Sequence, residues 1–350
     1  MIDRRALVAA GGIAAIFLLV QLGALALVEP FREAGLQAVE DPQDPTNSAL
    51  YVGLLLVVTL FMLAAIKFEL TWVIRVVVVA TGAYFAWLVL DAFGGLLGVP
   101  PTIGSAAGGV IALAIAVGLW VHPEWYVIDA AGVLMGAGAA GLFGISFGVL
   151  PAIVLLVALA VYDAISVYRT EHMLTLAEGV MDLRIPVVLV IPIERGYSFL
   201  EDGPSIGDDT ADTDGGEESH DRDTTVEQSP TASDADASGE AATDSDPLDR
   251  GALFIGLGDA VMPTVLVASA VAFTPGGVAV STIGGLPYTV PALGAMLGTF
   301  VGLAVLVRMV LAGRAHAGLP MLNGGAIAGY LLASLAVGVD LLVALGVTSV

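Results

Sequence analysis

The sequence predicts an all-α integral membrane protein with nine transmembrane helices. Hydrophobic residues make up 57% of the 350 residues, and the mean hydropathy is +0.91. The chain therefore has more apolar surface than a soluble domain of this size can bury in its core. The apolar residues also come in long runs, and about 20 apolar residues in a helix cross a bilayer core about 30 Å thick. Such windows occur at 6–28, 49–66, 72–92, 103–121, 126–147, 150–168, 251–272, 287–311 and 319–345.

The ends of these windows carry the residues expected at helix boundaries. The first window follows Arg4 and Arg5 and is longer than the apolar region of a typical secretory signal, so we expect it to remain as a signal anchor. Prolines mark several later breaks, including Pro30, Pro100 and Pro275. The breaks therefore support separate helices rather than one extended apolar region.

A long polar segment separates the sixth and seventh windows. Between Glu201 and Asp246 there are sixteen acidic residues and one basic residue, Arg222, and this segment holds most of the net charge of −22. Such a composition predicts a disordered acidic loop, because it offers too little apolar area to offset the entropy of ordering. The acidity and the single lysine, Lys67, also suit a halophilic source.

The predicted organisation follows from these boundaries. Residues 171–181 fit a short amphipathic helix, and 186–192 are a β-branched run that is too short to cross a bilayer and is predicted to be a strand. The chain divides into helices one to six (1–170), the amphipathic helix and strand (171–200), the acidic loop (201–250) and helices seven to nine (251–350).

The distribution of cations predicts the orientation in the cell membrane. If the loops alternate between the two sides, one side collects eleven Lys and Arg residues and the other has only Arg32. Eight against one remain when Arg184, Arg195 and Arg222, which lie inside a long loop, are left out. We therefore expect the N-terminus and the acidic loop in the cytoplasm and the C-terminus outside.

Two aspartates stand out because ionisable residues inside a bilayer are costly. Asp163 lies six residues inside the sixth window from Arg169, which is ~9 Å along a helix. Asp259 lies eight residues into the seventh window from Gly251, ~12 Å from the same side. Their carboxylates can thus share one layer of the membrane. Three further aspartates near window ends are expected to be solvated or structural: Asp91, Asp129 and Asp340.

Paired carboxylates allow two different functions. One member holds a proton while the other stays charged, so the pair can activate water and protonate a leaving amine, as in aspartic proteases. Proton-coupled transporters also place paired acids in the membrane to bind ions. Depth alone leaves both functions open.

The residues around these aspartates resemble the motifs of a known protease family. Tyr162 precedes Asp163, and Gly256, Leu257 and Gly258 precede Asp259, which resembles the YD and GxGD motifs of presenilins and signal peptide peptidases, including archaeal-type members. The resemblance implies that Asp163 and Asp259 are the catalytic pair on the sixth and seventh of nine helices. Gly256 and Gly258 are then expected to permit close approach of a helix or a substrate backbone.

The third family motif, Pro-Ala-Leu at the start of the ninth helix, matches by position only. A literal Pro291-Ala292-Leu293 lies on the eighth window, whereas the ninth begins with Pro320, Met321 and Leu322. We assign the motif to Pro320, because proline in the first turn of a helix costs little. The resemblance also implies that the strand at 186–192 pairs with an unwound substrate.

Other protease chemistries lack their residues. None of the four histidines belongs to a His-Glu-x-x-His zinc motif, there is no cysteine, and Gly144-Ile145-Ser146-Phe147 lacks the final glycine of a rhomboid-type serine site. The predicted function is an intramembrane aspartic endopeptidase that needs no metal or cofactor. Its expected partners are transmembrane or signal-peptide substrates and the bilayer, with no nucleic acid; the sequence specifies no oligomeric state. A proton-coupled transporter and a catalytically silent scaffold are the alternatives.

Overall fold

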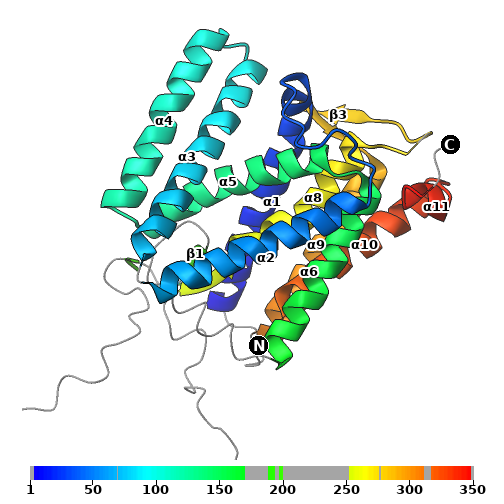
Figure 1. Cartoon of the computed structure of the whole chain (residues 1–350). Helices are drawn as coiled ribbons and strands as arrows, with labels where there is room; N and C mark the ends of the chain where they lie inside the picture. Colours follow the sequence, from blue (N-terminus) through cyan, green and yellow to red (C-terminus); the bar gives the residue numbers. More distant parts are fainter. Residues whose placement is uncertain are drawn as a thin grey trace, which may run out of the picture.

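The computed structural model describes residues 4–68, 70–169, 188–193, 197–199, 252–275, 277–310 and 317–347. In this part of the chain, eight helices are long and apolar enough to cross a membrane, and a ninth apolar helix is shorter. Two small two-stranded sheets complete the structure (Figure 1). The predicted all-α membrane fold is therefore confirmed. The predicted amphipathic helix at 171–181 and the acidic loop lie outside the described residues.

The eight long helices occupy most of the predicted windows. They are α1 (Arg4–Glu33), α2 (Thr46–Lys67), α3 (Thr71–Leu96), α4 (Pro101–Val121), α5 (Trp125–Ser146), α6 (Val149–Arg169), α9 (Val290–Val310) and α10 (Gly318–Ala336). The shorter elements are β1 (Val188–Pro192), β2 (Ala252–Gly256), α8 (Leu257–Ala272), β3 (Ser281–Ile283), β4 (Leu286–Tyr288) and α11 (Leu341–Ala344).

Three predicted boundaries were wrong. The first helix continues through Pro30 to Glu33. The seventh window, 251–272, begins with a strand, and its helix starts only at Leu257, because β2 pairs with β1 instead of coiling. The ninth window ends early, because Gly338 adopts a left-handed conformation (φ 81°) and stops α10.

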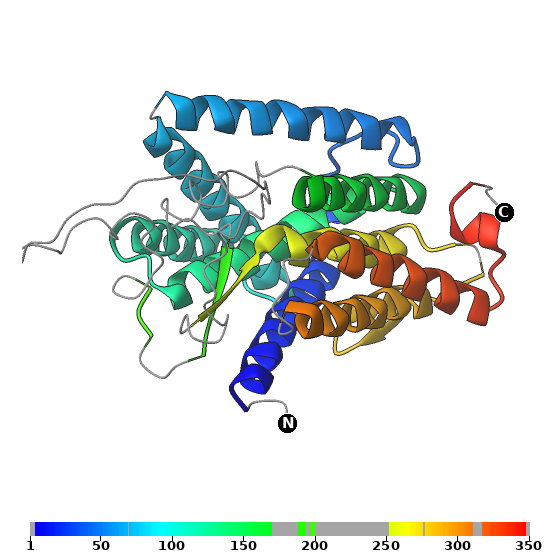
Figure 2. The same ribbon diagram turned by 90° about the horizontal axis from the view of Figure 1, so that it is seen from below.

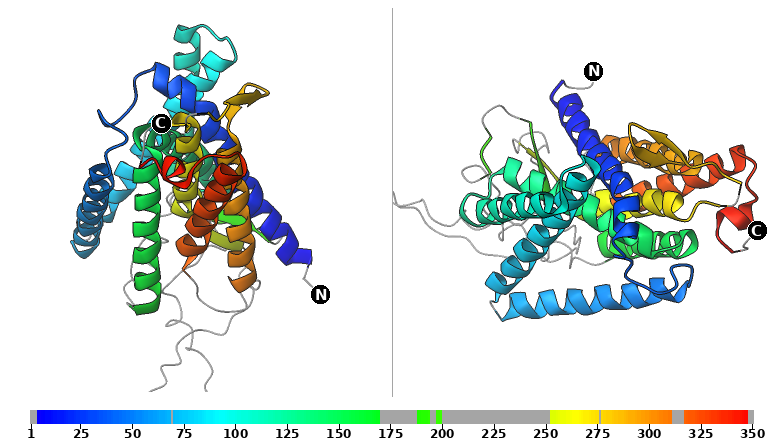
Figure 3. Two further views of the ribbon diagram at one scale, coloured as in Figure 1. Left: turned by 90° about the vertical axis from the view of Figure 1, so that its right-hand side faces the viewer. Right: turned by 90° about the horizontal axis from the view of Figure 1, so that it is seen from above.

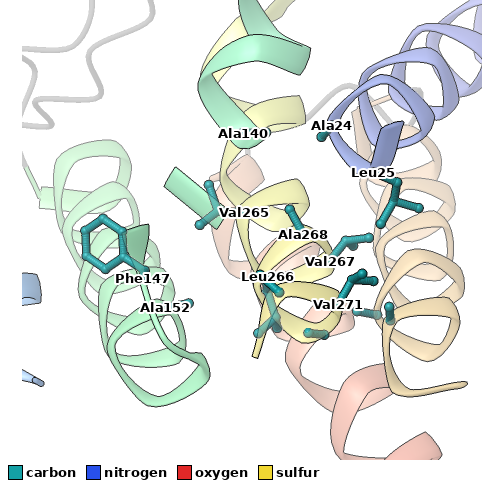
Figure 4. Close-up of a cluster of buried hydrophobic side chains, with 14 of the residues drawn as sticks. Ala24, Leu25, Ala140, Phe147, Ala152, Val265, Leu266, Val267, Ala268 and Val271 are labelled. Atoms are coloured by element: carbon teal, nitrogen blue, oxygen red, sulfur yellow. The ribbon is translucent and has the colours of Figure 1, made fainter. Parts of the chain in front are cut away.

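Helix α8 is the centre of the molecule. It lies among α1, α5, α6, α9 and α10 and contacts each of them (Figure 2). Nearly all of its side chains are buried. Val265, Leu266 and Val271 of α8 point into the main core, which α1 lines with Leu25 and the start of α6 with Ala152 (Figure 4). Five surrounding helices thus fix the position of a segment only 16 residues long.

Helices α9 and α10 pack backbone to backbone through glycines. A Cβ added to Gly298 would overlap the carbonyl oxygen of Gly325, and one added to Gly294 would overlap that of Gly329. Close approach through small residues is the usual way in which membrane helices associate, because lipid removes the hydrophobic driving force between them. The order of these contacts makes the two helices antiparallel, and it fixes the start of α10 beside the end of α9.

We expect Gly298→Ala to destabilise the fold by about 2 kcal/mol or more, because its methyl group has no room without backbone movement. Gly324→Ala on α10 is the matched control, since a Cβ there meets nothing within 4 Å among the described residues. Thermal unfolding of both variants in the same lipid or detergent tests this. Equal stability of the two variants would contradict the packing described here.

The outer part of the molecule is built from α2, α3 and α4. Helices α3 and α4 pair along their length, and α2 runs along the outside of the bundle with few buried residues (Figure 3). Arg75 of α3 donates to the carbonyl oxygens of Leu119 and Trp120 at 3.2 and 3.0 Å and lies over the Trp120 ring. This contact caps the last turn of α4 with a cation, which its helix dipole favours.

The predicted strand at 186–192 is found as β1 over the residues described, 188–192. It pairs antiparallel with β2, with Val190 opposite Phe254 and Val188 opposite Gly256. Helix α5 holds this two-stranded sheet from one side, because the Asp129 carboxylate accepts a hydrogen bond from the Val190 N–H at 2.8 Å. The sequence did not predict β2.

A second acid, just before α5, holds residues that follow β1. Both oxygens of Glu124, just before α5, accept hydrogen bonds, from the Ser198 hydroxyl at 2.6 Å and from the Phe199 N–H at 3.0 Å. Burial raises the pKa of the Glu124 carboxyl, but these hydrogen bonds outweigh burial, and the pKa lies below its usual value. The charged form is therefore the one that the fold stabilises.

This contact predicts a pH-dependent contribution to stability. A lowered folded pKa stabilises the protein above the unfolded pKa of about 4.3, and the contribution is lost as the pH falls through the folded pKa. Glu124→Gln should cost about 1 kcal/mol at pH 7, because its amide nitrogen cannot accept from Phe199. Thermal unfolding should show this gap narrowing below about pH 4, with Glu40→Gln, at an exposed position, as the control. A gap that does not change with pH would contradict it.

Candidate active site

Asp163 is buried on α6 and faces the first turn of α10. Its side chain is 8% exposed, and its Oδ2 accepts a hydrogen bond from the Leu319 N–H at 3.0 Å. The first N–H groups of a helix have no partner within that helix, and the residue before α10, Ala317, has no side chain that could cap them. The Asp163 carboxylate therefore does for α10 what an N-cap side chain does elsewhere.

Asp259 lies in the first turn of α8, as the third residue of the helix. The carboxylate of this half-buried side chain packs against Gly318, where an added Cβ would be 3.3 Å from its Oδ2. The N-terminus of a helix favours a negative charge in its first turn. The predicted depth of Asp259 within a long helix was wrong, because residues 252–256 form β2. Asp259 marks the beginning of its helix.

The two carboxylates meet at the start of α10. Asp163 binds the Leu319 N–H and Asp259 packs against the neighbouring Gly318, so both carboxylates lie at the first turn of α10. The apolar layer around them includes Leu257 and Leu322, both buried. Two acids in such surroundings favour a single shared negative charge, because ionising both at short range is costly. Such a pair has one member able to accept a proton and one able to donate.

The backbone around Asp259 is less constrained than in an ordinary helix. Pro263, one turn later, has no N–H, so it cannot bond the Asp259 carbonyl as a helical residue would. Gly256 precedes the helix, and among the described residues its added Cβ would meet only the Asp259 carboxylate, at 3.6 Å. The residues flanking Asp259 thus add little side-chain bulk beside its carboxylate.

Comparison with known proteins decides the family. The family model described as "Signal-peptide peptidase, presenilin aspartyl protease" matches residues 14–339. The chain belongs to this family of membrane proteases. A comparison with curated proteins gave no match.

Solved structures of the presenilin family agree with this. Two crystal forms of a presenilin family intramembrane aspartate protease, in space groups C222 and P2, are each 33% identical and cover 93% of this chain. The matches span 99% and 97% of those chains, with TM-scores of 0.59 and 0.58. The protein is thus a multi-pass intramembrane aspartyl protease, and the comparisons do not support the transporter alternative.

The presenilin motif residues next to the aspartates lie in different environments. Leu257 is buried and packs on α5, where a Cβ on Gly136 would be 3.1 Å from its Cδ1. Gly258 is exposed, and its added Cβ would meet nothing within 4 Å among the described residues. The close approach of another helix expected at Gly258 is therefore not seen in the described structure. Tyr162 is 49% exposed and lies outside the buried core.

The residues to which we assigned the third motif lie in the first turn of α10. Pro320 is the third residue of that helix, directly after Leu319, whose N–H binds Asp163. Leu322 is fully buried, and the Met321 carbonyl packs against Gly302 of α9. The literal Pro291 is the second residue of α9, and the start of α9 lies beside the end of α10 rather than beside its start, because Gly294 packs against Gly329.

Sequence reasoning missed two contributors to this site. Gly318 and the Leu319 N–H form the surface that both carboxylates contact, and only a glycine at the start of a helix hinted at this. Asn323, fully buried one turn later, donates from Nδ2 to the Leu156 carbonyl of α6 at 3.0 Å. A search for uncharged polar residues inside apolar windows would have found it. No group of described His, Cys, Asp and Glu side chains is arranged to hold a metal ion.

We expect Gly318→Ala to lower peptide turnover by about 10- to 100-fold, because its Cβ would press on the Asp259 carboxylate and displace it. Thermal stability should change little, since the carboxylate can move aside. Gly324→Ala, on the same helix but in open space, should keep wild-type turnover. Initial rates on one transmembrane peptide measure both. Wild-type rates for Gly318→Ala would show that the Asp259 position is not set by this contact.

Proposed function

We propose that Asp163 and Asp259 form the catalytic dyad and that the enzyme hydrolyses peptide bonds within transmembrane segments or remnant signal peptides. The observation that carries this proposal is the convergence of both carboxylates on the Gly318-Leu319 backbone. Family membership supplies the class of reaction, and this geometry supports the choice of residues. The remaining aspartates of the membrane helices lie elsewhere: Asp91 on α3 and Asp129 on α5.

The dyad accounts for every proton in the reaction. The charged aspartate takes a proton from water as its oxygen attacks the scissile carbonyl carbon, while the protonated aspartate donates to the carbonyl oxygen. The tetrahedral diol then returns a proton to the dyad as its C–N bond breaks, and the amine nitrogen takes the other proton. One water is consumed, an acid and an amine are released, and the dyad regains its single proton.

The substrate must unwind, because a transmembrane helix hides its peptide groups in internal hydrogen bonds. We propose that the unwound segment adds to β2 rather than to the strand first expected, β1. In the β1–β2 register the N–H groups of Ala252, Phe254 and Gly256 point away from β1. This edge of β2 ends at Gly256, beside Asp259. Addition of a strand here would deliver a peptide bond to the dyad.

We also propose an orientation of the protein in the membrane and a division of the chain into four segments. The cation distribution supports a cytoplasmic N-terminus and acidic loop and an outer C-terminus. The division into 1–170, 171–200, 201–250 and 251–350 places one aspartate of the dyad on each side of the acidic loop. The acidic, lysine-poor composition supports a halophilic, archaeal-type source.

We expect Asp163→Asn and Asp259→Asn each to abolish cleavage of a transmembrane peptide, because either change leaves the pair unable both to accept and to donate a proton. Both variants should fold, since the amide is neutral and similar in shape. Asp91→Asn is the control and should keep most activity. The wild-type rate should be bell-shaped in pH, as for a coupled pair. An active Asp259→Asn enzyme would overturn the dyad.

A further inference from the structure

Asp129 is an acid in a membrane helix that the proposed chemistry does not use. It is the fifth residue of α5 and half-buried, and an ionisable side chain at this depth is costly to insert. Its Oδ1 accepts the Val190 N–H of β1 at 2.8 Å. Within the described part of the chain, the acid therefore serves a strand that is linked to the dyad through its neighbour, β2.

The register shows on which edge of the β1–β2 sheet this hydrogen bond lies. The Val190 N–H points at α5, so the N–H groups of Leu189 and Ile191 point at β2, and residues 188, 190 and 192 face away from it. Residue 192 is a proline and has no N–H. Asp129 thus occupies the central donor on the outer edge of β1.

Apolar side chains of the β1–β2 sheet also pack onto α5. Val190 belongs to a buried cluster with Ile128 and Ala131 of α5, and Phe254 of β2 packs against that cluster. On the other side, Ile191 packs against α1 at Gly12, where an added Cβ would be 3.0 Å from its Cγ2. The apolar contacts hold the β1–β2 sheet between α5 and α1, but they do not fix how far β1 lies along its own direction. Within β1, the hydrogen bond that the Asp129 carboxylate accepts from the Val190 N–H does.

Position along the strand matters because β2 leads directly into the site. Val190 is opposite Phe254, which lies two residues before Gly256. Gly256 is the residue before α8, and a Cβ added to it would be 3.6 Å from the Asp259 Oδ2. A shift of β1 on α5 moves β2 with it. A substrate strand added to β2 would then present a different bond to the dyad.

We propose that Asp129 is a positioning residue: by fixing Val190 on α5 it sets the register in which β2 presents the substrate, and so determines which peptide bond is cut. This proposal rests on the proposed dyad and on addition of the substrate to β2. It requires a hydrogen-bond acceptor at position 129 rather than a charge.

The experiment compares full-length variants on one transmembrane peptide, with rates from initial velocities and cleavage positions from mass spectrometry. Asp129→Ala should lower kcat/KM by up to about tenfold, the usual effect of losing one hydrogen bond, and should add cuts at neighbouring bonds. Asp129→Asn should restore the rate and the wild-type cleavage pattern, because its amide oxygen still accepts. Asp91→Ala, an acid removed from α3, should behave as wild type.

A second variant removes the donor and leaves the acid in place. Val190→Pro lacks the N–H but keeps an extended backbone at an edge that makes no strand pairing. It should reproduce the broadened cleavage of Asp129→Ala, and the double variant should be no worse than either single one. This variant also decides the matter if Asp129→Ala does not fold.

Each outcome bears on one proposal. A single wild-type cut from Asp129→Ala or from Val190→Pro would overturn the positioning role, and so would an Asp129→Asn enzyme as broad in its cuts as Asp129→Ala. Asp163→Asn is run in the same assay and must be inactive. If Asp163→Asn cleaves, the dyad has failed, whatever the Asp129 variants do.

Discussion

Two carboxylates inside an apolar layer need hydrogen-bond donors, and this constraint organises the molecule. The start of α10 supplies them, because the first N–H groups of a helix have no partner within it. Asp163 takes the Leu319 N–H, and Asp259 packs against the glycine before it. The site therefore exists only where three helices, α6, α8 and α10, meet at one height in the membrane.

The heights of these three helices are set by different means. Helix α10 is fixed by its glycine contacts with α9, and Asn323 ties it to the Leu156 carbonyl of α6. Helix α8 begins at the right level because the residues before it are used as strand β2. A continuous helix through 251–272 would have placed Asp259 more than a turn inside, where the capping geometry of a first turn is not available.

The sequence singled out Asp163 and Asp259 through their short motifs and their approximate depth in the sixth and seventh windows. Asp163 and Asp259 could be placed in one layer from window boundaries alone, even though the boundary of the seventh window was wrong. The sequence did not predict β2, because Ala252–Gly256 is an apolar run, and hydropathy does not distinguish an apolar strand from an apolar helix. The deciding fact was the partner strand, some sixty residues earlier in the chain. Gly318 and Asp129 were not predicted as contributors for the same reason, since their contacts are with residues distant in sequence.

The backbone contact between α9 and α10 has a mechanical consequence. With Gly294, Gly298 and Gly302 seated against the other helix, sliding or rotating one helix alone would drive carbonyl oxygens into α-carbons. Packed surfaces of this kind move as rigid units rather than deform. The wall that carries the Leu319 N–H thus behaves as a stiff two-helix plate. We expect an entering helix to be accommodated on the lightly packed side of the bundle, where α2 contacts mainly α6 and is otherwise little buried.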